Sequence, residues 1–335
     1  MSTNIGHKLT KQSVMDNITR YLSASAIIIL LAVMTATQDN FLSAYNLKNL
    51  LRDPAPLLIM AAGMTMVLII GGIDLSMGAV CSVSNVLYVR LMLLYAERFG
   101  SPVIFGIICT LICLVFGALS GLALGLIQAK LKVPSFIASL GFMSVWQSVA
   151  LLITPAPEVM PKVLWPSITW YKITVAEVIG LPLLIAMLLV LAVYALTKYT
   201  AFGKSIYAIG GNERTARISG INVEKTKVSV FVVSGMLAAL AGVFLIANLK
   251  SSSPSTGEPY TLQIVASCAL GGTSLAGGKG SVLGTILGVF TVAVINNSMT
   301  FVGIDAYWQN VVFGAFVLGA IALTVDRKTR GLIVK

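Results

Sequence analysis

The chain has 335 residues, of which 57% are hydrophobic and only 10% are charged, and its mean hydropathy is +0.92. A soluble domain carries roughly 25% charged residues, so this composition excludes an ordinary water-soluble protein and indicates lipid as the main solvent. The net charge of +11 does not indicate a nucleic-acid partner, because the basic residues gather at the ends of apolar runs. We expect contact with anionic membrane lipid and no nucleic acid.

Apolar runs of membrane-spanning length follow one another along the chain. A transmembrane helix needs ~20 mostly apolar residues, and no polar or charged linker separates the runs. The sequence therefore predicts an all-α polytopic membrane protein with about ten transmembrane helices, in a single domain over residues 1–335. The predicted helices are 21–38, 54–72, 77–97, 102–128, 134–154, 173–197, 227–249, 262–277, 281–302 and 307–325.

The distribution of basic residues predicts the orientation of the chain. With both termini in the cytoplasm, the inner segments hold 16 of the 23 basic residues and the outer segments hold 7, as the positive-inside rule requires. We expect residues 1–20 and 326–335 to be cytoplasmic tails and residues 198–227 to be a cytoplasmic loop. No small-residue cleavage site follows the first apolar run, so we expect that run to be retained as a helix.

Two glycine-rich segments suggest that the chain contains two related halves. Residues 71–78 read GGIDLSMG, and residues 271–278, which begin 200 positions later, read GGTSLAGG. Glycines then recur every four residues in both halves, a spacing that lets helices pack closely. These glycines are Gly117, Gly121 and Gly125 in the first half and Gly280, Gly284 and Gly288 in the second. The pattern predicts an internal duplication built around Gly-interrupted helices.

The paired glycines also point to a transport pathway. Adjacent glycines end a helix easily, and irregular backbone at membrane depth is tolerated where protein buries it or where it lines a cavity. Short, interrupted segments in corresponding halves mark the binding region of many secondary transporters. Our candidates for the translocation path or its gate are Gly71, Gly72, Asp74, Ser76, Gly271, Gly272, Thr273 and Ser274.

Asp74 admits several interpretations. It is the only charged residue between Asp53 and Arg90, and an ionisable residue inside a membrane is a functional candidate by default. A structural alternative is that Asp74 or Ser76 caps the helix that follows. The other two interpretations are that Asp74 contacts the transported solute directly and that it acts at the cytoplasmic gate.

Residue patterns for catalysis and for ATP binding are missing from the sequence. A P-loop needs Gly, four residues, Gly-Lys and then Ser or Thr, but with Lys279 as the lysine the first position is Thr273 and the last is Gly280. The four cysteines lie in apolar stretches without ligand spacing and are predicted to be small buried hydrophobic residues. The only histidine is His7, in the polar N-terminal tail. We expect no enzyme activity, metal or cofactor in this chain.

The segment 198–227 has features of a docking element. Gly210-Gly211-Asn212 predicts a turn, with Asn212 as the N-cap of a short helix that runs to Ser219 and stops at Gly220. The residues that we expect to couple this chain to a partner are Gly210, Gly211, Asn212, Glu213, Arg214, Arg217 and Gly220. The alternative is a solvated amphipathic connector.

With these motifs in order, the sequence resembles the permease subunits of ribose/galactoside/xylose-type ABC importers. The resemblance covers nearly the whole chain and rests on Gly63-Met64-Thr65, GGIDLS at 71–76, VPSFIASLG at 133–141 and the loop described above. The most specific segment is GGTSLAGGKG at 271–280.

The resemblance implies a function and a set of partners. Such a permease carries a monosaccharide or a sugar-like solute across the bacterial inner membrane, and it pairs with a second permease chain as a homodimer or with a sister permease. A cytoplasmic ATPase with two nucleotide-binding domains binds and hydrolyses Mg-ATP, and a periplasmic sugar-binding protein delivers the solute. Residues 210–221 would be the segment through which the ATPase acts.

One segment departs from the family pattern. Members often have Tyr-Glu-Leu-Asp just before the second glycine-rich segment, whereas this chain has Tyr260-Thr261-Leu262-Gln263. The identity of the solute therefore stays open. The alternatives to a sugar permease are a branched-chain amino-acid or nucleoside permease, a carrier or channel that acts alone and, least favoured, a membrane enzyme.

Overall fold

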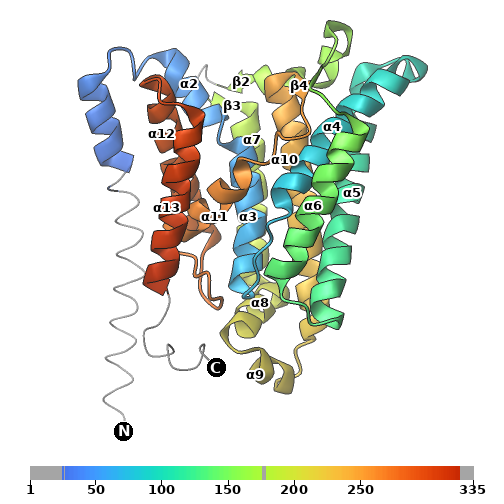
Figure 1. Cartoon of the computed structure of the whole chain (residues 1–335), viewed down its shortest axis with the longest axis vertical. Helices are drawn as coiled ribbons and strands as arrows, with labels where there is room; N and C mark the ends of the chain where they lie inside the picture. Colours follow the sequence, from blue (N-terminus) through green and yellow to red (C-terminus); the bar gives the residue numbers. More distant parts are fainter. Residues whose placement is uncertain (1–24, 26, 176–178, 325–335) are drawn as a thin grey trace.

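The computed structural model describes residues 25, 27–175 and 179–324 (Figure 1). The predicted tails 1–20 and 326–335 lie outside the described residues. An apolar helix, Ile27–Thr37, is followed by α2 Ala44–Arg52, α3 Ala55–Ile69, α4 Met77–Tyr95, α5 Pro102–Lys130, α6 Ser135–Ile153, α7 Leu181–Tyr199, α8 Ala201–Gly211, α9 Glu213–Ile218, α10 Val223–Leu249, α11 Tyr260–Leu270, α12 Val282–Phe301 and α13 Ala306–Thr324.

The remaining elements are short and belong to the connections. Three 3₁₀ helices span Ala96–Phe99, Lys162–Ser167 and Thr169–Lys172. Strands β1 (Glu158–Val159) and β4 (Ser251–Ser252) pair antiparallel, as do β2 (Thr174–Val175) and β3 (Ile179–Gly180).

Among the described residues, seven helical stretches are long and apolar enough to cross a membrane. They are Ala44–Ile69, Met77–Phe99, Pro102–Lys130, Ser135–Ile153, Leu181–Tyr199, Val223–Leu249 and Val282–Phe301. The all-α polytopic membrane class is therefore confirmed. Two shorter apolar helices, Ile27–Thr37 and Tyr260–Leu270, lie in the first and eighth predicted spans or next to them, and the count of about ten stays a prediction.

Several predicted helix bounds were wrong. The span predicted at 173–197 begins instead at Leu181, because β2 and β3 occupy its first residues and Pro182 stands in the first turn of α7. The spans predicted to end at 72 and 277 end at Ile69 and Leu270. In both cases the next residues include a glycine with positive φ, which stops the helix earlier than the apolar pattern suggests.

Helix α3 forms the centre of the bundle. Every one of its residues is buried, as expected for a helix that is apolar on all sides. It packs against α7, α10, α11 and α12, and Figure 1 shows it between these helices. Its C-terminal end points toward α8, so this buried helix connects the middle of the bundle to the end where α8 and α9 lie.

The four-residue glycine spacing places helix backbones in contact, as predicted. A Cβ atom on Gly117 or Gly121 of α5 would collide with the carbonyl of Gly235 or Phe231 in α10, and one on Gly125 would lie 2.9 Å from the Val228 Cα. In the second half, Gly284 and Gly288 of α12 press in the same way against Gly271, the residue after α11, and Ser267 of α11. Gly280, the third predicted glycine of this half, lies instead in the turn before α12. Only glycine permits these two close crossings.

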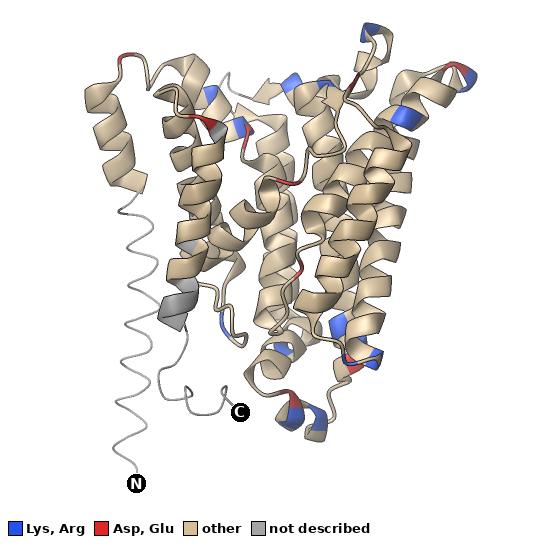
Figure 2. Ribbon diagram, in the orientation of Figure 1, with Lys and Arg blue, Asp and Glu red and all other residues tan. Residues whose placement is uncertain are grey.

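Among the described residues, the charged ones are concentrated at the two ends of the bundle, and few lie along the helices between them (Figure 2). Many large apolar side chains on α5, α6 and α7 are exposed, which is the expected arrangement for surfaces in contact with lipid. All four cysteines are free and buried, as predicted.

Candidate coupling element and solute path

The segment predicted as a loop at 198–227 is mostly helical. Helix α7 runs to Tyr199, the side chain of Thr200 caps α8, and α8 continues through Gly210 and Gly211. The predicted Gly210-Gly211-Asn212 turn was therefore wrong: α8 packs at Gly210 against Ile69 and Gly278 and continues to Gly211. The chain turns one residue later, at Asn212, which has extended backbone angles.

The caps of α9 agree with the sequence prediction. The Asn212 Oδ1 atom accepts a hydrogen bond of 2.9 Å from the Thr215 N–H. At the other end Gly220 has φ of 84°, and its N–H and that of Ile221 bond back to the carbonyls of Arg217 and Ala216. This is the glycine-terminated Schellman motif. Helix α9 therefore has a defined start and stop although it is only 6 residues long.

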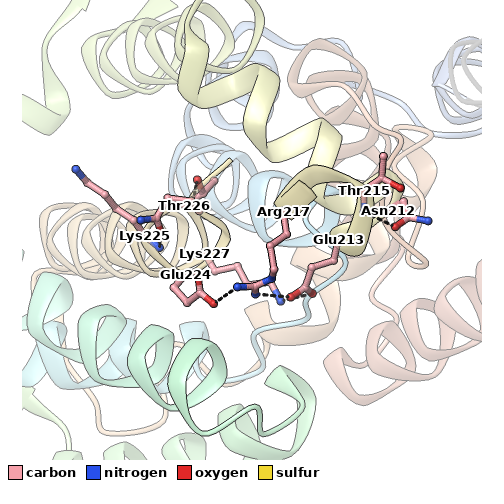
Figure 3. Close-up of polar contacts among 9 residues, drawn as sticks. Asn212, Glu213, Thr215, Arg217, Glu224, Lys225, Thr226 and Lys227 are labelled. Carbon is pink, nitrogen blue, oxygen red and sulfur yellow. Dashed lines mark hydrogen bonds and ion pairs between the residues drawn. The ribbon is translucent and has the colours of Figure 1, made fainter. Parts of the chain in front are cut away.

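An ion-pair network ties α9 to the first turn of α10 (Figure 3). The Arg217 Nη1 atom lies 2.6 Å from the Glu224 Oε1, and its Nη2 lies 3.5 Å from the Glu213 Oε1. The Lys227 Nζ lies 2.8 Å from the Glu213 Oε2. The hydrogen bond from Lys227 lowers the pKa of Glu213, so its contribution to the network persists near neutral pH and falls away as pH drops through that lowered pKa.

The predicted docking residues thus divide into two groups. Glu213 and Arg217 pair with each other, and Arg217 also pairs with Glu224 of α10. They therefore hold α9 against α10, a role that the sequence did not reveal. Arg214 is exposed and makes no ion pair with any described residue. It is the basic group of α9 that remains available to a partner.

The end of α8 lies against both glycine-rich segments. A Cβ atom on Gly210 would collide with the Ile69 carbonyl oxygen at the end of α3 and would come within 2.6 Å of the Gly278 nitrogen. The same two groups bond to each other, since the Gly278 N–H donates to the Ile69 oxygen at 2.8 Å. The Tyr207 Oη, one turn earlier in α8, donates to the Gly280 carbonyl at 2.9 Å. The structure therefore places Gly210, one of the predicted docking residues, beside the end of α3 and the turn that contains Gly278 and Gly280.

The two interrupted helices end in the same way. Helix α3 ends with Gly71 at φ of 82° and with N–H bonds from Gly71 and Gly72 to Leu68 and Val67. Helix α11 ends with Gly272 at φ of 81° and with the equivalent bonds from Gly272 and Thr273. The structural correspondence pairs Gly71 with Gly272, a shift of 201 positions rather than the 200 that the sequence alignment suggested.

Asp74 and Ser76 form a closed local structure. Both are buried, and the Asp74 Oδ1 accepts hydrogen bonds from the Ser76 N–H at 2.9 Å and from the Ser76 Oγ at 2.6 Å. The N-cap position of α4 is Ser76, whose side chain makes no capping bond. Asp74 therefore orders the turn before α4 instead of capping the helix, and the Ile73 N–H, which donates to Ser135 Oγ at 2.9 Å, fastens this turn to α6.

The second glycine-rich segment turns back on itself. The Ser274 N–H donates to the Lys279 carbonyl at 3.0 Å, and Gly277 and Gly278 both have positive φ. The Thr273 hydroxyl is buried and has no hydrogen-bond partner among the described residues. This segment therefore connects α11 to α12 by a compact turn that rests on the ends of α3 and α8.

Two cavities lie at opposite ends of the bundle. One, of about 670 Å³, lies beside the contact between Tyr207 of α8 and Gly280. It is bordered by Tyr194, Lys198, Lys204 and Tyr207. The other, of about 440 Å³, lies among α2, the start of α3, the start of α11 and the end of α12. Asp74 lines neither of them.

Sequence reasoning missed the polar residues of the second cavity, which include Asn46, Asn296 and Asn297. The signal was present, because adjacent asparagines inside the apolar run 281–302 are costly in a membrane and therefore functional candidates. Gln263, at the position where the chain departs from the family pattern, lines this same cavity.

Comparison with known proteins agrees with this architecture. A family described as the permease component of the branched-chain amino acid transport system matches residues 46–321. The ribose import permease protein RbsC of Escherichia coli K12 is 33% identical over 308 residues, which cover 91% of this chain and 93% of RbsC. No solved structure matches the chain significantly.

Two further relatives extend the comparison. RbsC of Bacillus subtilis 168 is 36% identical over 302 residues, which cover 90% of each chain. The xylose transport system permease protein XylH of Escherichia coli K12 is 33% identical over 374 aligned positions, which cover 94% of this chain and 93% of XylH. The chain therefore belongs to the ABC importer permease family that includes the ribose and xylose permeases, whose members are membrane subunits and not themselves enzymes.

Proposed function

We propose that this chain forms the translocation path of a binding-protein-dependent ABC importer for a monosaccharide or a sugar-like solute. The support for a sugar is that relatives named for ribose and xylose align with at least nine-tenths of the chain. The family description names branched-chain amino acids instead, and an amino-acid solute is therefore the rival proposal. The path crosses the bacterial inner membrane, with both termini of the chain in the cytoplasm.

The proposal includes three partners. A cytoplasmic ATPase with two nucleotide-binding domains supplies the energy from Mg-ATP, and a periplasmic binding protein delivers the solute. A second permease chain completes the path. In this arrangement residues 1–335 act as one membrane domain with two related halves, and the end that carries α8 and α9 faces the cytoplasm.

The observation that carries the proposal is the contact of α8 with the end of α3 and with the turn that connects α11 to α12. Gly210 lies against the Ile69 carbonyl and Gly278, and Tyr207 bonds to the Gly280 carbonyl. In this proposal a displacement of α8 would move the end of α3 and the turn that connects α11 to α12. ATP binding would shift the population between inward- and outward-open states to the extent that the ATPase binds the two states with different affinity.

The direct test is the composition of the native complex. We expect that mild-detergent extraction of the chain from its own membrane copurifies an ATPase with two nucleotide-binding domains, in stoichiometric amount. Charge reversal of the exposed Arg214 should weaken this association. A chain that purifies alone and carries solute down an ion gradient in liposomes would show that it is a secondary carrier.

A further inference from the structure

The cavity of about 440 Å³ near α2 and the end of α12 is unusually rich in amide side chains. Its volume falls within the ~300–1,000 Å³ range of small-molecule sites. The polar residues on its wall are Asn46, Asn49, Gln263, Asn296, Asn297 and Thr300. Polar groups at this density are expensive inside a membrane bundle and indicate a function.

Two of the amides satisfy each other and form a fixed part of the wall. The Asn46 Nδ2 donates to the Asn297 Oδ1 at 3.1 Å, and the Asn297 Nδ2 donates back to the Asn46 Oδ1 at 2.9 Å. Asn46 is also bonded to the Phe41 carbonyl at 2.8 Å. This pair joins α2 to α12 and needs no ligand.

The neighbouring pair is incomplete. The Asn296 Nδ2 donates to the Gln263 Oε1 at 3.3 Å, whereas the Asn296 Oδ1 is buried and has no partner among the described residues. The Nε2 donors of Gln263 take no part in that bond. Buried acceptors are nearly always hydrogen-bonded in proteins. Asn296 and Gln263 both line the cavity. An acceptor that lacks a partner, on a residue next to a donor, is the pattern that a ligand hydroxyl would complete, since a hydroxyl accepts and donates at once.

The charges on the wall select the class of ligand. No Lys or Arg is among the described residues that line the cavity. The one charged residue among them, Asp53, is paired with Arg52 just outside the lining at 3.1 Å. A carboxylate or phosphate ligand would lack a cationic partner, which makes a zwitterionic amino acid or a phosphorylated sugar a poor fit. The rings of Tyr260 and Phe301 offer apolar faces to the C–H side of a ligand.

We infer that this cavity is a solute site of the permease and that it binds a neutral polyhydroxylated solute through Asn296 and Gln263. The inference rests on the proposed function, and it specifies where the solute is held and why a sugar is preferred over an amino acid.

Two nearly isosteric variants test the site. Asn296→Leu removes the unpaired acceptor, and Gln263→Met removes its neighbour with little change of volume. The control is Gln147→Met on α6, which also loses a long-range hydrogen bond, from its Nε2 to the Pro254 carbonyl at 3.1 Å, but lies outside the cavity lining. Saturation-transfer NMR on the purified full chain would measure binding of D-ribose and D-xylose, with L-leucine as the zwitterionic comparison.

We expect sugar binding without leucine binding, a dissociation constant raised about tenfold in Asn296→Leu and in Gln263→Met, and no change in Gln147→Met. The same variants in the complete importer should take up sugar more slowly than the parent. Parental binding and parental uptake in both variants would overturn the solute site while leaving the importer intact. A parent complex that imports neither sugar with ATP would overturn the proposed function itself.

Discussion

Gly210 occupies the point where three backbone segments meet: the end of α8, the end of α3 and the turn at 277–280. The Ile69 carbonyl and the Gly278 nitrogen both lie where a Cβ atom of residue 210 would stand. Neither atom belongs to a flexible side chain, so neither yields without moving a helix end. The requirement for glycine here comes from close approach and not from backbone angle, since Gly210 lies inside a regular helix.

Gly210→Ala should therefore destabilise the chain by about 1–3 kcal/mol, the usual effect of overpacking, and should uncouple ATP hydrolysis from transport. Gly211→Ala is the matched control, because nothing lies within 4 Å of its Cβ position and alanine favours the helix. Thermal unfolding in detergent and substrate-stimulated ATP hydrolysis would measure the two effects. Equal behaviour of the two variants would contradict the proposed contact.

The hydrogen bonds from Ser76 give Asp74 a local structural role, and we propose that this role, and not the negative charge, is what the position requires. Asparagine retains an acceptor oxygen for both bonds, so we expect Asp74→Asn to transport at close to the parental rate. Asp74→Leu leaves the Ser76 N–H and Oγ without their partner inside the protein and should lose about 1–3 kcal/mol of stability. Solute uptake and the amount of folded chain would be measured for both variants, which separates a loss of stability from a loss of transport. Loss of transport in a well-folded Asp74→Asn would show that the negative charge itself is required.

At the scale of elements, α9 is held by charge pairs on one side and presents Arg214 on the other. Arg214→Glu should leave α9 folded and reduce substrate-stimulated ATP hydrolysis severalfold. Arg217→Glu places a third carboxylate beside Glu213 and Glu224, so we expect it to loosen α9 itself. Limited proteolysis of the segment between α8 and α10 would report this loosening. If Arg214→Glu hydrolyses ATP as the parent does, α9 does not dock through this residue.

The contact between α5 and α10 makes an equally specific prediction. A side chain at Gly121 would meet the Phe231 carbonyl of α10, so Gly121→Leu should separate the helices and cost about 3 kcal/mol. Gly141→Leu on α6 is the control, because its Cβ position is open. The yield of folded, monodisperse protein after extraction would distinguish the two variants. Equal yields would mean that the crossing is looser than the structure shows.

Local signals in the sequence predicted the parts of this architecture that depend on local chemistry. Asn212 and Gly220 at the ends of α9, and Gly71 and Gly272 after the interrupted helices, follow from capping and positive-φ preferences. The continuation of α8 through Gly210 and Gly211 was not predictable, because contacts with Ile69 and residues 277–280 stabilise it. These residues lie far away in the sequence, and local propensity carries no information about them.

The cavity illustrates the same limit. Asn46, Gln263 and Asn296 come from three separate helices and become one wall only in the folded bundle. The adjacent asparagines at 296 and 297 marked one helix as unusual, but the sequence did not show which helices would face them. Family resemblance gave the class of protein, and the structure gave the location of the polar groups.

The whole molecule is a membrane subunit without a chemical reaction of its own. Apolar helices form the body, α8 and α9 lie at one end of the bundle, and the amide-lined cavity lies at the opposite end. In the importer that we propose, energy arrives from the partner ATPase at the α8–α9 end. This separates the chain from a carrier that draws on an ion gradient.

The most direct test of this central claim is solute uptake by the purified complex in liposomes, with labelled D-ribose and the binding protein on the outer side. The account predicts uptake only when Mg-ATP is present on the side that carries α8 and α9, and predicts none when a proton or sodium gradient replaces ATP. Uptake by this chain alone, driven by an ion gradient and indifferent to ATP, would contradict it.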